Sequence, residues 1–328
     1  MFSLIIATFL ASLSGGAALP QSAPAEPTIL RESSVQKLDV PSFSSWDATP
    51  CDSHGNLYYR PVPPNNDYNA SVLRELDPKS QFPTVFQLPT SLATTSALMY
   101  VSVAASGRVR FLNQLKNLKY AVFGFDDDAQ FKSEADLELP DEMRPNRFLV
   151  AEDGVILVGG YYPKSAPKQL QGKTYLALFE KDGKLRKEIT GANLTDLDLA
   201  AAAGKMIEAV TAVGPEGFYY LQGQEILVIS EWGELVRHIN VKRPRGTTGA
   251  LRMDISEGLI SIEFYEKDEK GFLKPTFLVL DASSGDVYGL YKPSDDLGTV
   301  VVCFTRAKGY VFSRTVDGKI NLLTAALR

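Results

Sequence analysis

Short apolar stretches rich in β-branched and aromatic residues recur along most of the chain, and turns that contain glycine separate them. One signature comprises a short strand, a glycine turn and a second apolar strand. Its copies centre on Gly55, Gly107, Gly154, Gly217, Gly258 and Gly309. Glycine suits these turns because tight hairpins need positive φ angles, which glycine adopts at little steric cost. The pattern predicts an all-β chain built from repeated hairpins.

A second hairpin signature, with Asp or Gly in its turn, follows most copies of the first. Two clear examples read YLALFEKDGKLRKEI and ILVISEWGELVRHINV, so each full unit has four short strands. Several units end on a proline, namely Pro89, Pro140, Pro244 and Pro293. The units repeat roughly every 50 residues, which is the length of a four-stranded propeller blade.

The two ends of the chain decide how the ring closes. After Gly309 the sequence provides one strand, a turn and a last strand, so the sixth unit lacks a fourth strand. The segment SVQKLDVP at residues 34–41 reads as an unattached fourth strand. We therefore predict one domain over residues 34–328, a six-bladed β-propeller of four-stranded blades whose last blade is completed by the N-terminal strand. Closing the ring in this way removes exposed strand edges, which invite aggregation.

The blade pattern, D/E-x-x-G-x-φ-φ-φ followed by φ-x-x-φ-x-x-x-G, resembles that of the NHL-like and TolB-like six-bladed β-propeller superfamily. The resemblance covers nearly all of the chain after Val35. It implies the fold, and it implies a wide choice of functions, because such propellers include binding scaffolds, lactonases, other hydrolases and lyases. A fold shared by so many activities does not select one of them.

The N-terminal segment has the pattern of an export signal. Residues 4–13 form an apolar run, LIIATFLASL, and small residues follow it. That run is too short to span a bilayer, and no other run approaches the ~20 residues that spanning requires. We predict a signal peptide and processing region over residues 1–25, a short linker over 26–33 and a mature chain with no membrane span. The expected location is secreted or periplasmic.

The charged residues exclude one class of partner. The formal net charge is −5, and the lysines and arginines are scattered along the chain. A nucleic-acid-binding protein carries a basic patch or stripe instead. Nucleic acid is therefore not an expected partner.

Cys51 and Cys303 are the only cysteines. The first strands that hold them are predicted to be neighbours across the closure of the ring. In an exported protein such a pair can form a disulfide, and two separate buried thiols are the alternative. A zinc site needs more ligands than two thiols supply, so no metal centre is expected here.

Loop length predicts which face of the propeller binds. The turns between second and third strands and the crossings between blades share one face, which holds the long loops 60–71, 161–173 and 265–275. Loops on a rigid scaffold usually carry function, tyrosines stack on ligands, and arginines donate paired hydrogen bonds to carboxylate or phosphate. The candidate ligand-binding residues of this loop-rich face are Tyr68, Arg144, Arg147, Tyr161, Tyr162, Arg243, Arg245 and Tyr265.

Catalytic machinery is sparse in the sequence. His54 and His238 are the only histidines, both predicted away from the axis, and neither a G-x-S-x-G elbow nor a Walker loop is present. The family resemblance implies one enzymatic alternative, a calcium-assisted hydrolase or lactonase at the mouth of the central channel. Calcium needs six or more oxygen ligands, and the carboxylates on the predicted first strands are Asp47, Glu208 and Asp254.

The preferred hypothesis is an exported, non-catalytic binding propeller without a cofactor, whose loop-rich face engages a protein or an envelope glycan or peptide. The alternative is the calcium-assisted hydrolase, with calcium as its cofactor.

Overall fold

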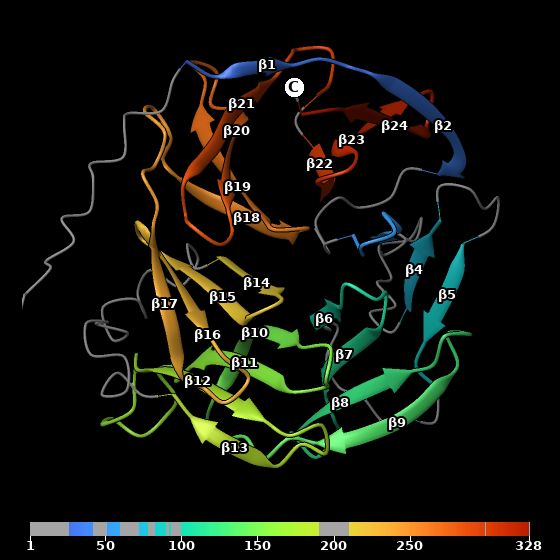
Figure 1. The fold of residues 1–328 in the computed structure, drawn as a ribbon. Coiled ribbons are helices and arrows are strands. Elements are labelled where there is room, and N and C mark those ends of the chain that lie inside the picture. The colour runs from blue at the N-terminus through green and yellow to red at the C-terminus, as the bar shows by residue number, and fades with distance from the viewer. Residues whose placement is uncertain are drawn as a thin grey trace, which may run out of the picture.

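A computed structural model describes residues 26–41, 51–59, 72–77, 83–89, 92, 100–189, 210–298 and 300–327. These residues form 24 strands and no helix. The strands are grouped into six sheets arranged in a ring around a central axis (Figure 1). The prediction of an all-β, six-bladed β-propeller is therefore confirmed. No helix of the described ranges is long and apolar enough to cross a membrane.

The first half of the ring contains three blades, each an antiparallel sheet. Blade one has three described strands, β3 (Leu57–Tyr59), β4 (Val72–Leu76) and β5 (Thr84–Gln87). Blade two comprises β6 (Tyr100–Val103), β7 (Val109–Gln114), β8 (Tyr120–Phe125) and β9 (Phe131–Asp136). Blade three comprises β10 (Arg144–Val150), β11 (Ile156–Tyr161), β12 (Thr174–Phe179) and β13 (Leu185–Glu188).

The second half repeats the same order. Blade four comprises β14 (Val210–Gly214), β15 (Gly217–Gln222), β16 (Glu225–Ile229) and β17 (Leu235–Asn240). Blade five comprises β18 (Gly249–Ser256), β19 (Leu259–Lys267), β20 (Leu273–Asp281) and β21 (Val287–Pro293). Blade six has β22 (Val300–Thr305), β23 (Gly309–Val316) and β24 (Lys319–Ala325).

The N-terminal strand closes the ring as predicted. Strand β2 (Ser34–Pro41) pairs antiparallel with β24 and supplies the fourth strand of blade six. Residues 26–33, expected to be a short linker, contain a further strand, β1 (Thr28–Leu30), which pairs in parallel with β21 as a fifth strand of blade five. The physical reason is burial, because Leu30 packs into the apolar cluster between blades five and six. The predicted signal region, residues 1–25, lies outside the described residues.

The hydrophobic core lies between neighbouring blades. Each apolar cluster draws its members from two adjacent sheets; in one of them Tyr219 and Val228 of blade four pack with Met253 and Ile262 of blade five. Strand residues that point to either side of a blade are therefore buried, which explains the nearly continuous apolar runs in the second and third strands. This packing holds the first strands rigidly around the axis.

Arginines also tie neighbouring blades together through backbone carbonyls. The guanidinium of Arg186 in blade three donates to the carbonyl of Glu231 at 2.8 Å, and that of Arg237 in blade four donates to the carbonyl of Ser283 at 2.7 Å. Arg186 also lies over the ring of Trp232, 4.7 Å from its centroid. Each contact joins an outer strand to the hairpin of the next blade.

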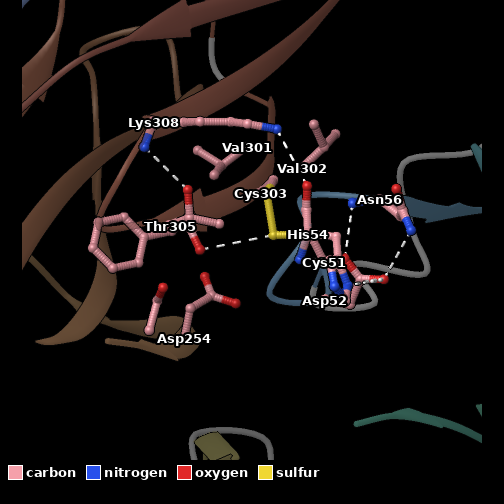
Figure 2. The surroundings of a disulfide bond; sticks show 12 residues. Cys51, Asp52, His54, Asn56, Asp254, Val301, Val302, Cys303, Thr305 and Lys308 are labelled. Atoms are coloured by element: carbon pink, nitrogen blue, oxygen red, sulfur yellow. Dashed lines mark hydrogen bonds and ion pairs between the residues drawn. A yellow bond between two sulfur atoms is a disulfide. The ribbon is translucent and has the colours of Figure 1, made fainter. Parts of the chain in front are cut away.

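A disulfide joins blade one to blade six. Cys51 and Cys303 are bonded across a sequence separation of 252 residues, and their Cα atoms are 5.3 Å apart (Figure 2). Of the two alternatives left open by the sequence, the structure contains the bonded one. The bond lies on the axial side of the ring, at the closure between the two ends of the propeller.

Candidate functional site

The first strands of blades two to six, together with residues 51–53 of blade one, surround an axial cavity of about 530 Å³. All six blades contribute to its described lining. Hairpin residues such as Ser53, Ala105, Glu152 and Glu257 line one end, so the cavity extends to the face formed by the turns between first and second strands. That face is opposite to the loop-rich face.

Three of the first strands carry a β-bulge at the cavity. The pairing register shifts at Asn146 in blade three, at Leu251 in blade five and at Val302 in blade six. A bulge inserts one extra residue and re-aims the side chains around it. Leu251 is 52% exposed and lines the cavity. In blades three and five the residue after the bulge is an arginine, Arg147 or Arg252, and both line the cavity.

Arg252 forms a buried ion pair in the cavity wall. Its Nε lies 2.7 and 3.0 Å from the two carboxylate oxygens of Asp254. The same guanidinium donates to the carbonyls of Val301 at 3.2 Å and Val302 at 3.3 Å in blade six. Both residues are buried, with Arg252 6% exposed and Asp254 7% exposed. Burial raises the pKa of Asp254, and the positive charge of Arg252 opposes this shift.

Further polar groups lie behind this pair, between blades five and six. Glu263 on β19 pairs across the strands with Arg252, and Ser261 pairs with Asp254. The hydroxyls of Ser261 and Tyr310 are 2.6 Å apart and share a hydrogen bond. We call Arg252, Asp254, Ser261, Glu263 and Tyr310 the blade five–six polar cluster. Few charged groups occur in blade interfaces, because an unpaired buried charge is costly.

The pKa shifts in this cluster follow from burial and from the two carboxyl groups. Burial raises the pKa of Glu263 to about 7; the nearby charge of Asp254 acts in the same direction, and Arg252 acts against it. Burial likewise holds the pKa of Tyr310 well above its ordinary range, so the phenol stays protonated. The carboxylate of Glu263 accepts no hydrogen bond from a described residue. The cluster thus contains two carboxyl groups and one guanidinium, and only Asp254 is hydrogen-bonded to that guanidinium.

Arg147 occupies the position in blade three that Arg252 occupies in blade five. Leu149 stands two residues later, where blade five has Asp254. Burial lowers the pKa of Arg147, and the neighbouring phenols of Tyr100 and Tyr220 oppose this effect. The hydroxyl of Tyr100 donates to the carbonyl of Pro145 at 2.7 Å.

Among the described residues predicted to bind ligand, Arg147 alone lines the cavity. Arg144 lies across from Tyr161 at the end of the first hairpin of blade three, on the loop-rich face. Tyr162 packs edge-on against Tyr175, with ring centroids 6.4 Å apart. Tyr68 lies outside the described residues.

The blade five members of the predicted set remain near the strand ends of the loop-rich face. A guanidinium nitrogen of Arg243 donates to the carbonyl of Thr248 at 2.9 Å, and Arg245 is exposed in the same turn. Tyr265 pairs with Gly249 in the sheet and is half-buried. The described lining of the axial cavity includes none of these side chains.

Of the three carboxylates predicted to bind calcium, the structure describes one. Asp47 and Glu208 lie outside the described residues. Asp254 lines the cavity, but it is a single carboxylate whose two oxygens both accept from Arg252, whereas calcium needs six or more oxygen ligands. Among the described residues no group of three or more His, Cys, Asp or Glu side chains is arranged to hold a metal ion. The residues described here do not fit a calcium centre at Asp254.

Arg252, Glu263 and Tyr310 are not among the site residues predicted from the sequence. A signal for two of them was present, because Arg252 and Asp254 alternate in a first strand and Glu263 interrupts the apolar run of the next strand. Charged residues at alternate positions of a buried strand lie on one face. Charged side chains on a buried face need other polar groups beside them, so this pattern indicates a polar cluster.

No protein-family model matches the chain, and no curated protein matches it in sequence. Solved structures of similar fold are found at low identity. They include a luciferin-regenerating enzyme, with 11% identity and a TM-score of 0.47 over 90% of this chain and 97% of that one. A gluconolactonase from Xanthomonas campestris has 13% identity and a TM-score of 0.45, with coverage of 93% and 99%. A putative glucose dehydrogenase from a Thermus species has 11% identity and a TM-score of 0.43, with coverage of 90% and 99%.

Proposed function

We propose that this chain is an exported, non-catalytic binding propeller that holds a small organic ligand in its axial cavity. The observation that carries the proposal is the cavity itself, about 530 Å³ in volume and lined by apolar first-strand residues with a few charged groups among them. Ligand sites in proteins typically enclose about 300–1,000 Å³ and have this mixture of lining groups. The cavity reaches the hairpin face, which provides a route for entry.

The state of the charged wall favours binding over hydrolysis. Asp254 is held by Arg252 at 2.7 Å, and Arg252 is itself held by two backbone carbonyls of blade six. A general base needs a free oxygen within hydrogen-bond reach of its proton. Residues fixed in this way shape a site and set its charge.

Export is supported by two features. The apolar run of residues 4–13 has the pattern of a signal peptide. The disulfide between Cys51 and Cys303 is of the kind that persists in oxidising compartments. Engagement of a protein, envelope glycan or peptide by the loop-rich face stays a separate prediction, which rests on loop length and on the tyrosines and arginines of that face.

The test is to fill the cavity. Leu251→Trp adds a large side chain at the exposed bulge residue without displacing a buried one. Thermal unfolding of the wild-type protein would be scanned against sugars, amines, carboxylates, aromatic compounds and calcium. A compound present at ~100 times its Kd adds about 2.7 kcal/mol, which is visible as a raised Tm. We expect a compound that raises the Tm of the wild type and leaves that of Leu251→Trp unchanged.

A matched control separates cavity filling from a general effect of tryptophan. Val236→Trp introduces the same side chain at an exposed position of the outer strand β17 and should retain the ligand-induced shift. Equal shifts in the wild type and in Leu251→Trp would place the ligand elsewhere and refute the proposal. A shift produced by calcium alone would favour the hydrolase instead.

A further inference from the structure

The described cavity wall carries more negative than positive groups. Its charged lining residues are Asp52, Glu152, Asp254, Glu257, Arg147 and Arg252. Glu263 lies directly behind this wall, paired across the strands with Arg252. A ligand that enters the cavity therefore meets an excess of carboxylates.

Two of these carboxylates already accept hydrogen bonds from hairpin residues. Asp52 accepts from the backbone amide of Asn56 at 2.9 Å (Figure 2). It also accepts from the backbone amide of His54 at 2.9 Å and from the hydroxyl of Tyr58 at 3.0 Å. The two oxygens of Glu152 accept from the amide and the hydroxyl of Ser106 at 2.8 Å. Asp52 is thus held within its own hairpin, and Glu152 is held by the hairpin of blade two.

The blade five–six polar cluster differs in its charge balance. The donors of Arg252 point to Asp254 and to two carbonyls of blade six, whereas the carboxylate of Glu263 accepts no hydrogen bond from a described residue. When Asp254 and Glu263 are both ionised, the cluster lacks one positive charge. A proton bound to Glu263 restores the charge balance. A cationic group placed in the cavity beside Asp254 would restore it as well.

We propose that the ligand of the axial cavity carries a positive charge, such as an amine, which lies against Asp254 and releases a proton from Glu263 as it binds. This inference rests on the proposed function and names the class of its ligand. No other charged side chain of the described residues faces Glu263: β18 presents Arg252 and Asp254, β19 itself presents Ser261, β20 presents the apolar Phe277, and blade six presents the neutral Tyr310. The raised pKa of Glu263 agrees with a proton stored there at neutral pH.

The test uses one carbon skeleton with different charges. The probes are 3-phenylpropylamine, 3-phenylpropanol and 3-phenylpropionate, titrated by calorimetry into the full-length mature protein. We expect the amine to bind about tenfold or more tightly than the carboxylate, because opposite charges attract strongly in a partly buried site. Its affinity should rise about tenfold between about pH 6 and about pH 8, since the amine, with a pKa of ~10, stays charged throughout.

Proton release is measured by repeating the amine titration in buffers with different enthalpies of ionisation. The wild type should release a fraction of a proton near neutral pH, and Glu263→Gln should release none. Glu134→Gln, at an exposed position of β9, is the matched control and should behave as the wild type. Equal or tighter binding of the carboxylate would overturn the ligand class, and unchanged release in Glu263→Gln would overturn the role of Glu263.

These failures are distinguishable from failure of the proposed function. If the alcohol or the carboxylate binds best and Leu251→Trp abolishes that binding, the cavity remains a ligand site and the inference about charge is wrong. If none of the probes, and no compound of the wider panel, binds in a way that Leu251→Trp abolishes, the proposed function falls and the inference falls with it.

Discussion

Replacing Glu263 by glutamine should stabilise the protein at alkaline pH and leave it nearly unchanged at acid pH. Burial between blades five and six raises the pKa of this carboxyl from an ordinary value near 4.5 to about 7. A group whose pKa is raised by folding favours the folded state below its unfolded-state pKa. That contribution is lost as the pH rises through the folded-state pKa. Glutamine has nearly the same shape and does not ionise.

The magnitude follows from the size of the shift. One pKa unit corresponds to about 1.4 kcal/mol, so the ionised carboxylate of Glu263 costs about 3 kcal/mol of unfolding free energy once the pH is well above 7. Asp254 adds to this cost and Arg252 reduces it, and both effects are contained in the shift. The free-energy difference between Glu263→Gln and the wild type should therefore grow between about pH 5 and about pH 8.5, from near zero to about 3 kcal/mol.

The assay is urea unfolding at several pH values with the disulfide intact, followed by tryptophan fluorescence. Because both proteins contain the same other titrating groups, those groups cancel in the difference. Glu134→Gln removes an exposed carboxylate from β9 and should give a difference that does not change with pH. Parallel pH profiles for Glu263→Gln and the wild type would show that Glu263 titrates normally and would refute the account of the polar cluster.

Two further predictions concern the closure and the turns of the ring. Reducing the bond between Cys51 and Cys303, or replacing both residues by serine, should lower the unfolding free energy by on the order of 4 kcal/mol, since the bond closes a long loop; an unchanged urea midpoint would contradict this. Gly309→Ala should cost about 3 kcal/mol or more, because its φ is +77° and a Cβ there would strike the carbonyl oxygen of Ala325. Gly318→Ala, with φ +73° and no atom within 4 Å, should cost only about 1 kcal/mol, and equal costs in thermal unfolding would contradict the steric reasoning.

The sequence was sufficient for the fold because each blade repeats the same local signals. The six signature glycines all have positive φ, between 77° and 120°, as their hairpins require. The assignment of residues 34–41 to blade six followed from counting strands, and it is confirmed by the pairing of β2 with β24. Strand β1 escaped prediction because a strand of three residues carries almost no periodicity.

The candidate site was less accessible to sequence reasoning. Loop length drew attention to the loop-rich face, whereas the axial cavity is bounded by short hairpins and by strands that alternate in the ordinary way. The bulge at Leu251 shifts the strand pairing by one residue and so changes the direction of the neighbouring side chains. The sequence contains no pattern that predicts this shift. The pairing of Arg252 with Glu263 depends on register, and the contact with blade six depends on the ring.

The pairings of the N-terminal strands set an order of events in folding. Strands β1 and β2 are synthesised before their partners β21 and β24, which come much later in the sequence. Contacts between such distant segments form slowly, because a large loop must close before they contribute. The described strands of blades two to four have only local pairings and can fold as soon as they are made, whereas β1 and β2 stay unpaired until β21 and β24 have been made. A helper protein would therefore act by protecting the unpaired strands β1 and β2 until β21 and β24 have been made.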